Sequence, residues 1–223
     1  MTRAIVFGGT GALGSAIVER LRADGWSVDV AGRRIGDGIS IDLSDPEWTS
    51  GLDPYSAVVW AQGTNVTAGV LEADSGQMHQ LYDANVVFVT ETLRQLVAGG
   101  LLASLSRGVV LSSVWQITAR SNKVAYVASK AALGGLIPAI AIDLAAAGFA
   151  INGVLPGVID TPMTRSNLSA EQLAHVQSET LGGTLATPQD VASAVSWLVD
   201  PRAAGINGQW IAVDNGWSAA RSV

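Results

Sequence analysis

A serine, a tyrosine and a lysine stand at a spacing that can support acid–base chemistry. Ser113 lies thirteen residues before Tyr126, and Lys130 follows Tyr126 by four. Positions i and i+4 share one face of a helix, so we expect the phenol and the ammonium to point into one pocket. A free tyrosine titrates near ~10, and a nearby positive charge lowers that pKa because it favours the phenolate. The trio therefore predicts proton transfer to or from an alcohol or a carbonyl oxygen.

A glycine-rich turn far upstream predicts a dinucleotide site. Gly8, Gly9, Gly11 and Gly14 follow a short apolar run and open a helical pattern. Such a turn needs residues without Cβ where the backbone approaches a pyrophosphate, and the helix behind it presents free N–H groups to the phosphates. In isolation the run could be a mere strand-to-helix turn. Its position after the first expected strand favours dinucleotide binding.

The residues after the second expected strand bear on the choice of cofactor. An NAD-selective site usually has an acidic residue there, which accepts hydrogen bonds from the ribose 2′-OH. This chain has Gly32 followed by Arg33 and Arg34. A guanidinium matches a 2′-phosphate in charge and geometry, so we expect NADP(H) in preference to NAD(H). The alternative is that both arginines are solvated surface charges.

Short apolar runs alternate with longer helical patterns along the chain. The expected strands are Ala4–Phe7, Ser27–Ala31, Ile39–Ile41, Ala57–Trp60, Val109–Ser112, Ala150–Val154 and Gln209–Val213. The expected helices are Gly14–Ala23, Asp74–Ala98, Ala125–Ala147 and Pro188–Val199. Continuously apolar strands indicate burial on both faces, and strand–helix alternation implies a parallel sheet. We predict an α/β fold with a doubly wound, Rossmann-like parallel sheet of about seven strands and helices on both faces, as one domain over residues 1–223.

The stretch from residue 156 to residue 187 has weak periodicity and several turn residues. We expect a substrate lid over about residues 160–187, at the carboxyl edge of the sheet, where open α/β sheets bind ligands. Met163 and Leu181 suggest an apolar cover, and Glu171 and Glu179 suggest a solvated outer side. These residues favour a moderately hydrophobic substrate.

Composition and charge limit the classes of molecule that we expect this protein to bind. The net charge of −6 argues against a nucleic-acid surface. The chain has no cysteine, and its N-terminus resembles no signal peptide, so we expect a cytoplasmic protein without a membrane partner. The apolar stretch Ala131–Ile151 is better explained as a buried helix and strand than as a membrane span. His79 and His175 have no acidic or cysteine partners at ligand spacing, so we expect no metal site.

The ordered motifs resemble those of the short-chain dehydrogenase/reductase family, in its single-domain form with catalytic Asn, Ser, Tyr and Lys. The resemblance runs from Val6 to Trp217. Its motifs are the glycine turn, Asp42-Leu43, Trp60-Ala61-Gln62-Gly63, Asn85, Ser112-Ser113, Tyr126 with Lys130, the run Asn152 to Pro162, and landmarks at Thr187 to Ala192 and Asn207 to Gly216. Three departures stand out: Phe7 replaces the usual Thr, the glycines fit a G-x-x-G-x-x-G spacing, and Trp60 and Gln62 alter the usual Asn-Asn-Ala-Gly.

The resemblance implies reversible hydride transfer between NADP(H) and a carbonyl/alcohol pair. Tyr126 would exchange a proton with the substrate oxygen, which Ser113 would hold. Lys130 would lower the pKa of Tyr126 and bond the nicotinamide ribose, and Asn85 would hold a water that relays protons. The expected catalytic residues are therefore Asn85, Ser113, Tyr126 and Lys130. The expected cofactor contacts are Gly8, Thr10, Gly11, Leu13, Gly14, Arg33, Arg34, Asp42, Leu43, Ala61, Gln62, Gly63, Tyr126, Lys130, Pro156, Gly157, Ile159 and Thr161. The expected substrate contacts are Ser113, Trp115, Tyr126 and Met163, although Trp115 alone is equally consistent with simple packing.

The two long expected helices, Asp74–Ala98 and Ala125–Ala147, carry more apolar surface than one sheet face consumes. In the resembling family they form a dimer interface, so we expect a homo-oligomer, a tetramer or a dimer. The main alternative function is a non-catalytic NADP-binding regulator on the same fold. A second is an epimerase or dehydratase, which the glycine spacing suggests but which generally needs a larger C-terminal domain.

Overall fold

A parallel sheet of seven strands runs through the centre of the described structure, in the order β3-β2-β1-β4-β5-β6-β7. The structure is a computed structural model that describes residues 2–33, 36, 38–161, 164–165 and 168–219. The strands are β1 (Arg3–Phe7), β2 (Ser27–Gly32), β3 (Ile39–Ser40), β4 (Tyr55–Trp60), β5 (Leu102–Leu111), β6 (Ala150–Pro156) and β7 (Trp210–Val213). The doubly wound, Rossmann-like sheet expected from the sequence is confirmed.

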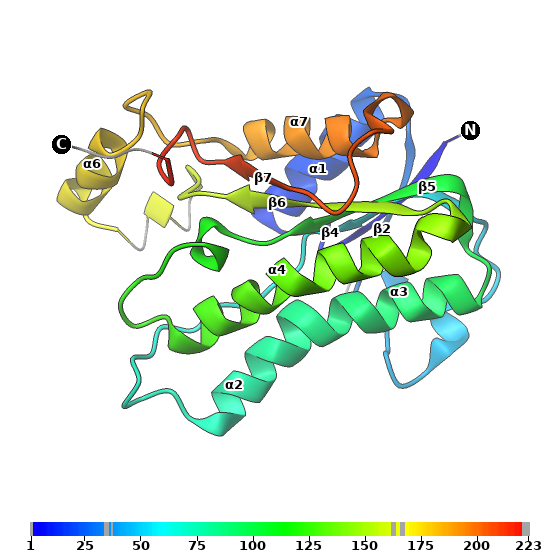
Figure 1. Cartoon of the computed structure of the whole chain (residues 1–223), viewed down its shortest axis with the longest axis horizontal. Coiled ribbons are helices and arrows are strands. Elements are labelled where there is room, and N and C mark those ends of the chain that lie inside the picture. Colours follow the sequence, from blue (N-terminus) through cyan, green and yellow to red (C-terminus); the bar gives the residue numbers. More distant parts are fainter. Residues whose placement is uncertain (1, 34–35, 37, 162–163, 166–167, 220–223) are drawn as a thin grey trace.

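Helices cover both faces of this sheet (Figure 1). One face carries α1 (Ala12–Ala23) and α7 (Pro188–Val199), which pack against each other. The opposite face carries α2 (Ser75–Tyr82), α3 (Phe88–Ala98) and α4 (Val124–Leu144). A further helix, α6 (Ala170–Ser178), lies beyond the carboxyl edge, beside the C-terminal segment (Figure 1).

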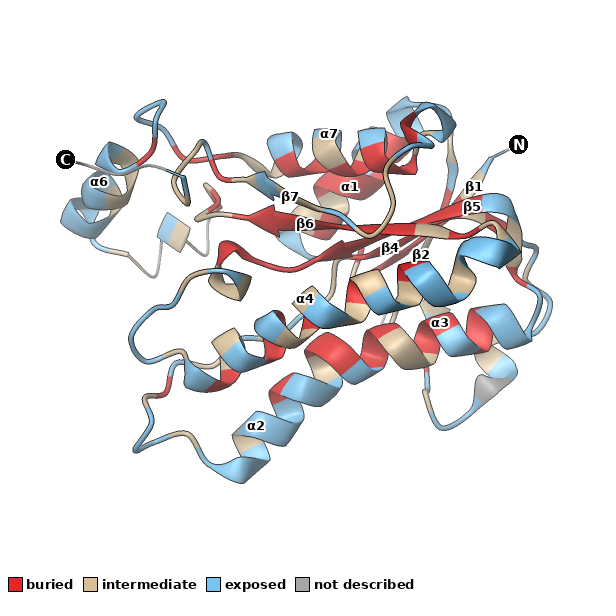
Figure 2. Ribbon diagram, in the orientation of Figure 1, coloured by how far each residue is buried: buried red, intermediate tan, exposed pale blue. Residues whose placement is uncertain are grey.

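Alternation along β1 explains how one strand serves both layers. Ala4 and Val6 belong to the core cluster under α1 and α7, whereas Ile5 and Phe7 belong to the cluster under α3 and α4. Successive side chains of a strand point to opposite faces, so a strand buried on both faces must be apolar throughout. Figure 2 shows this burial as nearly continuous red along the central strands.

Side-chain caps fix where the helices near the carboxyl edge begin. Ser169 and Gln172 form a reciprocal capping box at the start of α6, and Thr187 and Asp190 form another at the start of α7. Pro188 occupies the first turn of α7, where its missing N–H costs nothing. These caps satisfy the free N–H groups at the two helix starts.

Three elements differ from the sequence-based expectation. The helix expected over Asp74–Ala98 is divided by a π-helical turn, η2 (Asp83–Val87), between α2 and α3. Strand β5 begins seven residues earlier than expected, at Leu102, and includes Leu105 at a φ of 59°. Helix α6 was not expected, because the weak periodicity of its segment hides a helix with no buried residue.

Helix α4 continues through Pro138, which lies inside it. Together with the 3₁₀ turn η4 (Ala145–Ala147), it forms the one described segment that could cross a membrane by length and composition alone. In this fold the helix packs against β6, α2 and the 3₁₀ turn η3 (Val114–Gln116). It therefore serves as a layer of the fold and brings Tyr126 and Lys130 to the carboxyl edge.

Candidate active site

Ser113 and Tyr126 meet at the carboxyl end of β5. Ser113 follows that strand in extended conformation and begins η3, where its hydroxyl accepts a 3.3 Å hydrogen bond from the backbone N–H of Trp115. Tyr126 lies in the first turn of α4, close enough to Ser113 for the serine hydroxyl to act on the pKa of the phenol. The fold therefore brings Ser113 and Tyr126 to the same edge of the sheet.

Lys130 lies one turn further along α4 and is almost completely buried, with 4% of its surface exposed. Its ammonium donates a 3.1 Å hydrogen bond to the carbonyl oxygen of Leu111, the last residue of β5. Its Nζ lies 5.9 Å from the centre of the Tyr126 ring. Burial disfavours the charged form and lowers the pKa of Lys130 to about 8.

The pKa of Tyr126 moves in the direction opposite to the one expected. Burial raises it, and the hydrogen bond from Ser113 opposes that rise only in part. Lys130 is not among the groups that shift it. The physical reason is that desolvation penalises the phenolate, while the ammonium bonds the Leu111 carbonyl rather than the phenol oxygen.

Asn85 is buried in the π-helical turn η2 and holds two other segments in place. Its Oδ1 accepts a 2.9 Å bond from the backbone N–H of Thr64, and its Nδ2 donates to the Thr64 carbonyl at 3.1 Å. Nδ2 also donates to Ser129 Oγ at 2.9 Å, and Ser129 in turn donates to the Tyr126 carbonyl at 2.8 Å. Asn85 thus joins the loop after β4 to the helix that carries Tyr126. π-turns often occur at functional sites.

Gly63 brings the loop after β4 close to these groups. A Cβ at this position would lie 3.2 Å from Asn85 Oδ1 and 3.5 Å from Lys130 Nζ. Ala61 immediately precedes this stretch and donates its backbone N–H to the Phe7 carbonyl. The loop therefore connects the glycine turn after β1 with the buried Asn85 amide and the Lys130 ammonium.

The glycine turn forms a cradle that side chains would fill. Gly8 has a φ of +76°, and a Cβ there would lie 2.7 Å from the backbone nitrogen of Gln62. At Gly14 a Cβ would lie 2.1 Å from the Gly8 carbonyl oxygen. Gly11 is the N-cap of α1 and uses no side-chain cap, so the first N–H groups of the helix stay available. Leu13, in contrast, packs into the core, and Thr10 is exposed at the turn.

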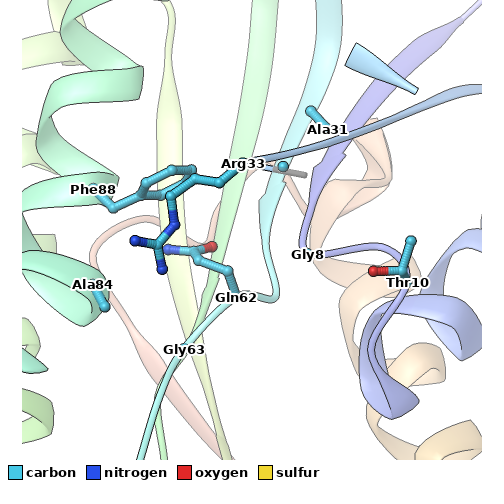
Figure 3. Close-up of a pocket in the computed structure, with 9 residues that line it drawn as sticks. Gly8, Thr10, Ala31, Arg33, Gln62, Gly63, Ala84 and Phe88 are labelled. Carbon is cyan, nitrogen blue, oxygen red and sulfur yellow. The ribbon is translucent and has the colours of Figure 1, made fainter. Parts of the chain in front are cut away.

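A pocket of about 170 Å³ opens beside this cradle (Figure 3). Arg33, Gln62 and Phe88 all line it (Figure 3). Gln62 Oε1 is buried without a hydrogen-bond partner among the described residues. The pocket is lined by Gly8, Thr10, Ala31, Gly32, Arg33, Gln62, Gly63, Ala84 and Phe88. A glycine cradle, a guanidinium and an unpaired acceptor fit the phosphate and ribose groups of a dinucleotide. Arg34 lies outside the described residues.

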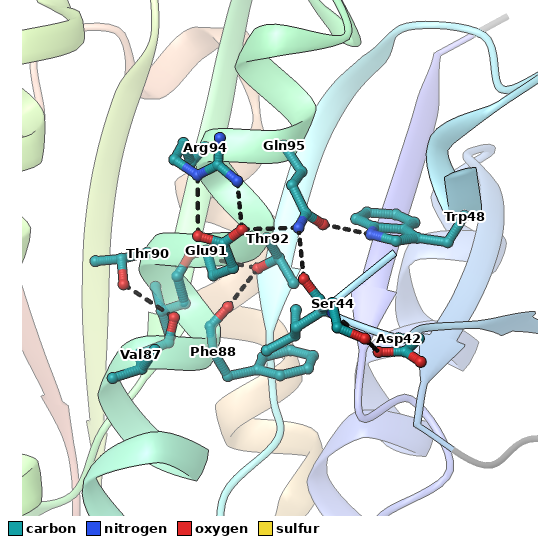
Figure 4. Close-up of polar contacts among 12 residues, drawn as sticks. Asp42, Ser44, Trp48, Val87, Phe88, Thr90, Glu91, Thr92, Arg94 and Gln95 are labelled. Atoms are coloured by element: carbon teal, nitrogen blue, oxygen red, sulfur yellow. Dashed lines mark hydrogen bonds and ion pairs between the residues drawn. The ribbon is translucent and has the colours of Figure 1, made fainter. Parts of the chain in front are cut away.

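The loop after β3 is tied to α3 through Gln95 (Figure 4). Gln95 is buried, donates to the Leu43 carbonyl at 3.1 Å and to Glu91 at 2.8 Å, and accepts a 2.5 Å bond from Trp48 Nε1. Asp42 accepts hydrogen bonds from the hydroxyl and the N–H of Ser44, which lower the pKa of its carboxyl group. The predicted adenine contacts, Asp42 and Leu43, thus lie in a loop held by a buried amide.

The loop after β6 approaches the same edge of the sheet. Pro156 ends β6, and the Gly157 N–H bonds the Val213 carbonyl at 3.0 Å. A Cβ on Gly157 would lie 2.6 Å from Asp214 Cβ. Ile159 and Thr161 are buried, and Thr161 accepts the N–H of Thr164 at 3.1 Å. Met163, a predicted substrate contact, lies outside the described residues.

The aromatic departures from the family pattern have a packing explanation. The Trp60 and Phe7 rings stack at 5.8 Å, and Phe88 meets Phe7 edge-on at 5.7 Å. Trp60 is fully buried and donates its Nε1–H to Thr92 at 2.8 Å. Phe7 and Trp60 therefore form a core beneath the pocket rather than a cofactor contact.

The predictions from the sequence did not include three residues at the site. Ser129 links Asn85 to Tyr126, as described above. Lys123 precedes α4 and clamps the loop after β4, donating to Asn65 at 3.0 Å and to Thr67 at 2.6 Å. Trp217 meets Trp115 edge-on, with ring centres 5.2 Å apart. Ser129 and Lys123 are polar residues within three positions of Tyr126 in the sequence, and that proximity could have identified them. Trp217 comes from a distant segment, so no local pattern points to it.

The sheet, the glycine cradle, the buried Asn85, Ser113 and Lys130 and the half-buried Tyr126 together have the architecture of a Rossmann-like oxidoreductase. Residues 51–218 match a family model described as Enoyl-(Acyl carrier protein) reductase. A cyclopentanol dehydrogenase from a Comamonas strain is 30% identical over 184 residues, covering 79% of this chain and 74% of that protein. The 3-oxoacyl-(acyl-carrier-protein) reductase MabA of Mycobacterium bovis is 28% identical, covering 95% of this chain and 91% of that protein.

A solved structure extends the match to the whole fold. The ligand-free aldohexose dehydrogenase of Thermoplasma acidophilum superposes with a TM-score of 0.88 at 24% identity, covering 100% of this chain and 96% of that one. The chain belongs to the short-chain dehydrogenase/reductase family, an oxidoreductase family that uses a nicotinamide cofactor.

Proposed function

We propose that this protein interconverts a carbonyl and an alcohol on a moderately hydrophobic small molecule, with NADP(H) as its cofactor. The observation that carries the proposal is the placement of the Tyr126 phenol close to the Ser113 hydroxyl, one helical turn from buried Lys130. The nicotinamide, when bound, supplies or accepts the hydride at the reacting carbon. The protein itself handles the proton and holds the substrate.

In the reducing direction Tyr126 donates its phenolic proton to the substrate oxygen. Its raised pKa keeps the phenol protonated at neutral pH, which suits a proton donor. Ser113 holds the substrate oxygen next to the phenol, since positioning is part of the rate. In the oxidising direction the same oxygen atom of Tyr126 accepts the proton.

Lys130 places a buried ammonium one helical turn from Tyr126, in position to bond the nicotinamide ribose. Because burial lowers its pKa to about 8, the ammonium is mostly charged below pH 8 and loses its charge above it. Asn85 helps to enclose Lys130, because it holds the loop that contains Gly63 close to Lys130 Nζ. A water held between them would relay protons to Lys130.

The preference for NADP(H) rests on Arg33. Its guanidinium shares the pocket with the glycine cradle, and that end of β2 has Gly32 in place of an acidic residue. A 2′-phosphate would give Arg33 a charge-assisted partner, whereas a 2′-OH would not.

A thermal-shift comparison tests this preference. Ligands that bind only the native state raise the melting temperature with the logarithm of their excess over Kd. We expect NADPH to raise it more than NADH at equal concentration, and Arg33→Ala to weaken NADPH binding roughly tenfold while leaving NADH binding unchanged. Arg202→Ala, an exposed arginine paired with Asp200, is the control. A larger shift with NADH for the wild-type protein would contradict the assignment.

The main alternative is a non-catalytic NADP-binding regulator on the same fold. The relatives' names cover both a ring alcohol, cyclopentanol, and 3-oxoacyl chains, which favours catalysis on a carbonyl/alcohol pair. NADPH oxidation measured against a panel of ketones separates the two. Turnover of at least one ketone supports the enzyme, and NADPH binding without any turnover supports the regulator.

The proposal includes a homo-oligomer, a tetramer or a dimer, in the cytoplasm. Apolar side chains are exposed on the outer faces of the sheet-covering helices: Tyr82 of α2, Val97 of α3, and Val124 and Ile142 of α4. Ile142 is 78% exposed. Exposed apolar side chains on the outer helices support an interface between subunits.

A further inference from the structure

Two tryptophans from distant parts of the chain form a corner beside Ser113. Trp115 belongs to η3, directly after β5, and Trp217 belongs to the segment after β7. Their ring centres are 5.2 Å apart, and their planes meet at 74°. The backbone N–H of Trp115 bonds Ser113 Oγ. This tryptophan corner, Trp115 with Trp217, is therefore joined through the Trp115 backbone to the residue that would hold the substrate oxygen.

Contacts on both sides hold the corner in place. Trp217 Nε1 donates to Glu179, at the end of α6, at 3.0 Å. The guanidinium of Arg120 lies 6.0 Å from the centre of the Trp115 ring, within the range of a cation–π contact. A Cβ on Gly216 would lie 2.4 Å from Leu181, so the segment before Trp217 packs closely on the lid. A corner fixed in this way is preorganised for a ligand of matching shape.

The corner is not sealed from solvent. Both indoles are half-buried, and two apolar side chains next to them in the chain or in space are largely exposed, Ile117 at 60% and Leu181 at 76%. Each indole already has its hydrogen-bonding or cation contact, so what remains open is apolar ring surface. Apolar surface that borders a catalytic serine is available for substrate.

We propose that the tryptophan corner binds a compact ring attached directly to the reacting carbonyl, so that the substrates are cyclic or aryl ketones and their alcohols. Two perpendicular indoles offer one face and one edge, the arrangement that another ring matches by stacking and edge contacts. An extended acyl chain gains binding energy only from the apolar area that it buries, and it can make neither the stacking nor the edge contact. Trp115 is two residues from Ser113. A ring bonded directly to the carbonyl carbon would therefore reach the Trp115 indole, whereas a group further along the substrate would not. This inference rests on the proposed carbonyl chemistry.

Size-matched ketones test the proposal. NADPH oxidation is followed with cyclohexanone against 2-hexanone and with acetophenone against 2-octanone. We expect kcat/KM to favour the ring member of each pair by about tenfold or more. Trp217→Leu, which keeps bulk but removes the aromatic surface, should cut that preference at least about fivefold, mainly through KM, and Trp217→Phe should restore most of it.

Trp197→Leu is the matched control, because Trp197 is 49% exposed on α7, away from the corner. It should leave the ring preference unchanged. Equal turnover of ring and linear ketones by the wild-type protein would overturn the proposal, even if the Trp217 variants fail to fold. So would a Trp217→Leu variant that lowers both members of each pair in equal proportion. Turnover without ring preference contradicts only the ring inference, whereas NADPH binding with no turnover contradicts the carbonyl chemistry itself.

Discussion

At the scale of single residues, the burial of Lys130 lowers the stability of the folded protein at neutral pH. An ammonium that is 4% exposed, with its pKa lowered to about 8, is held in the folded protein against a desolvation penalty. Between that value and the unfolded-state pKa near 10.4, the unfolded chain binds more protons than the folded one. The penalty is therefore complete below pH 8 and shrinks as the pH rises toward 10.

Lys130→Met should reveal this penalty. We expect the variant to lose turnover. Its free energy of unfolding, relative to that of the wild-type protein, should be most favourable at pH 7, because the variant removes a buried charge. As the pH rises from 7 to 9.5, the difference in free energy of unfolding should shift in favour of the wild-type protein. Urea denaturation at several pH values measures it. A difference that is independent of pH would show that Lys130 is not buried as an ammonium.

At the scale of elements, the loop that holds Asp42 and Leu43 depends on α3. Gln95→Leu removes the bond to the Leu43 carbonyl and leaves that group and Trp48 Nε1 without their partner. We expect a Kd for NADPH that is roughly fivefold higher, with kcat at saturating NADPH little changed. Arg94→Gln is the control, since it breaks the neighbouring ion pair with Glu91 and spares Gln95. If Gln95→Leu binds NADPH with unchanged affinity, this loop does not contribute to cofactor binding.

The elements also show what the sequence can and cannot predict. Helix α7 has both of the bounds expected for it, because Thr187, Pro188 and Asp190 are local start signals. The π-turn around Asn85 was not expected, because the helical periodicity continues through it and only the buried amide network marks the change. Trp217 was missed for a different reason. Its contact with Trp115 joins segments about a hundred residues apart, which local pattern does not encode.

At the scale of the whole molecule, Tyr82 of α2, Val97 of α3 and Ile142 of α4 are exposed in the part of the chain that the structure describes. Ile142→Glu places a charge on the exposed face of α4 and should shift the assembly toward monomer, as measured by light scattering at micromolar concentration. Leu71→Glu, at a side chain 92% exposed in a loop, should leave the assembly unchanged. A wild-type protein that is already monomeric would refute the proposed oligomer.

The central claim is that Tyr126 exchanges a proton with a carbonyl or alcohol oxygen. The most direct measurement compares Tyr126→Phe with the wild-type protein, using kcat for a reduced ketone together with the Kd for NADPH by fluorescence titration. The account predicts a loss of roughly 10²–10⁴ in kcat with the Kd changed by no more than about twofold, because the ring remains and only the acidic oxygen is lost. A variant that keeps near-normal kcat would contradict it.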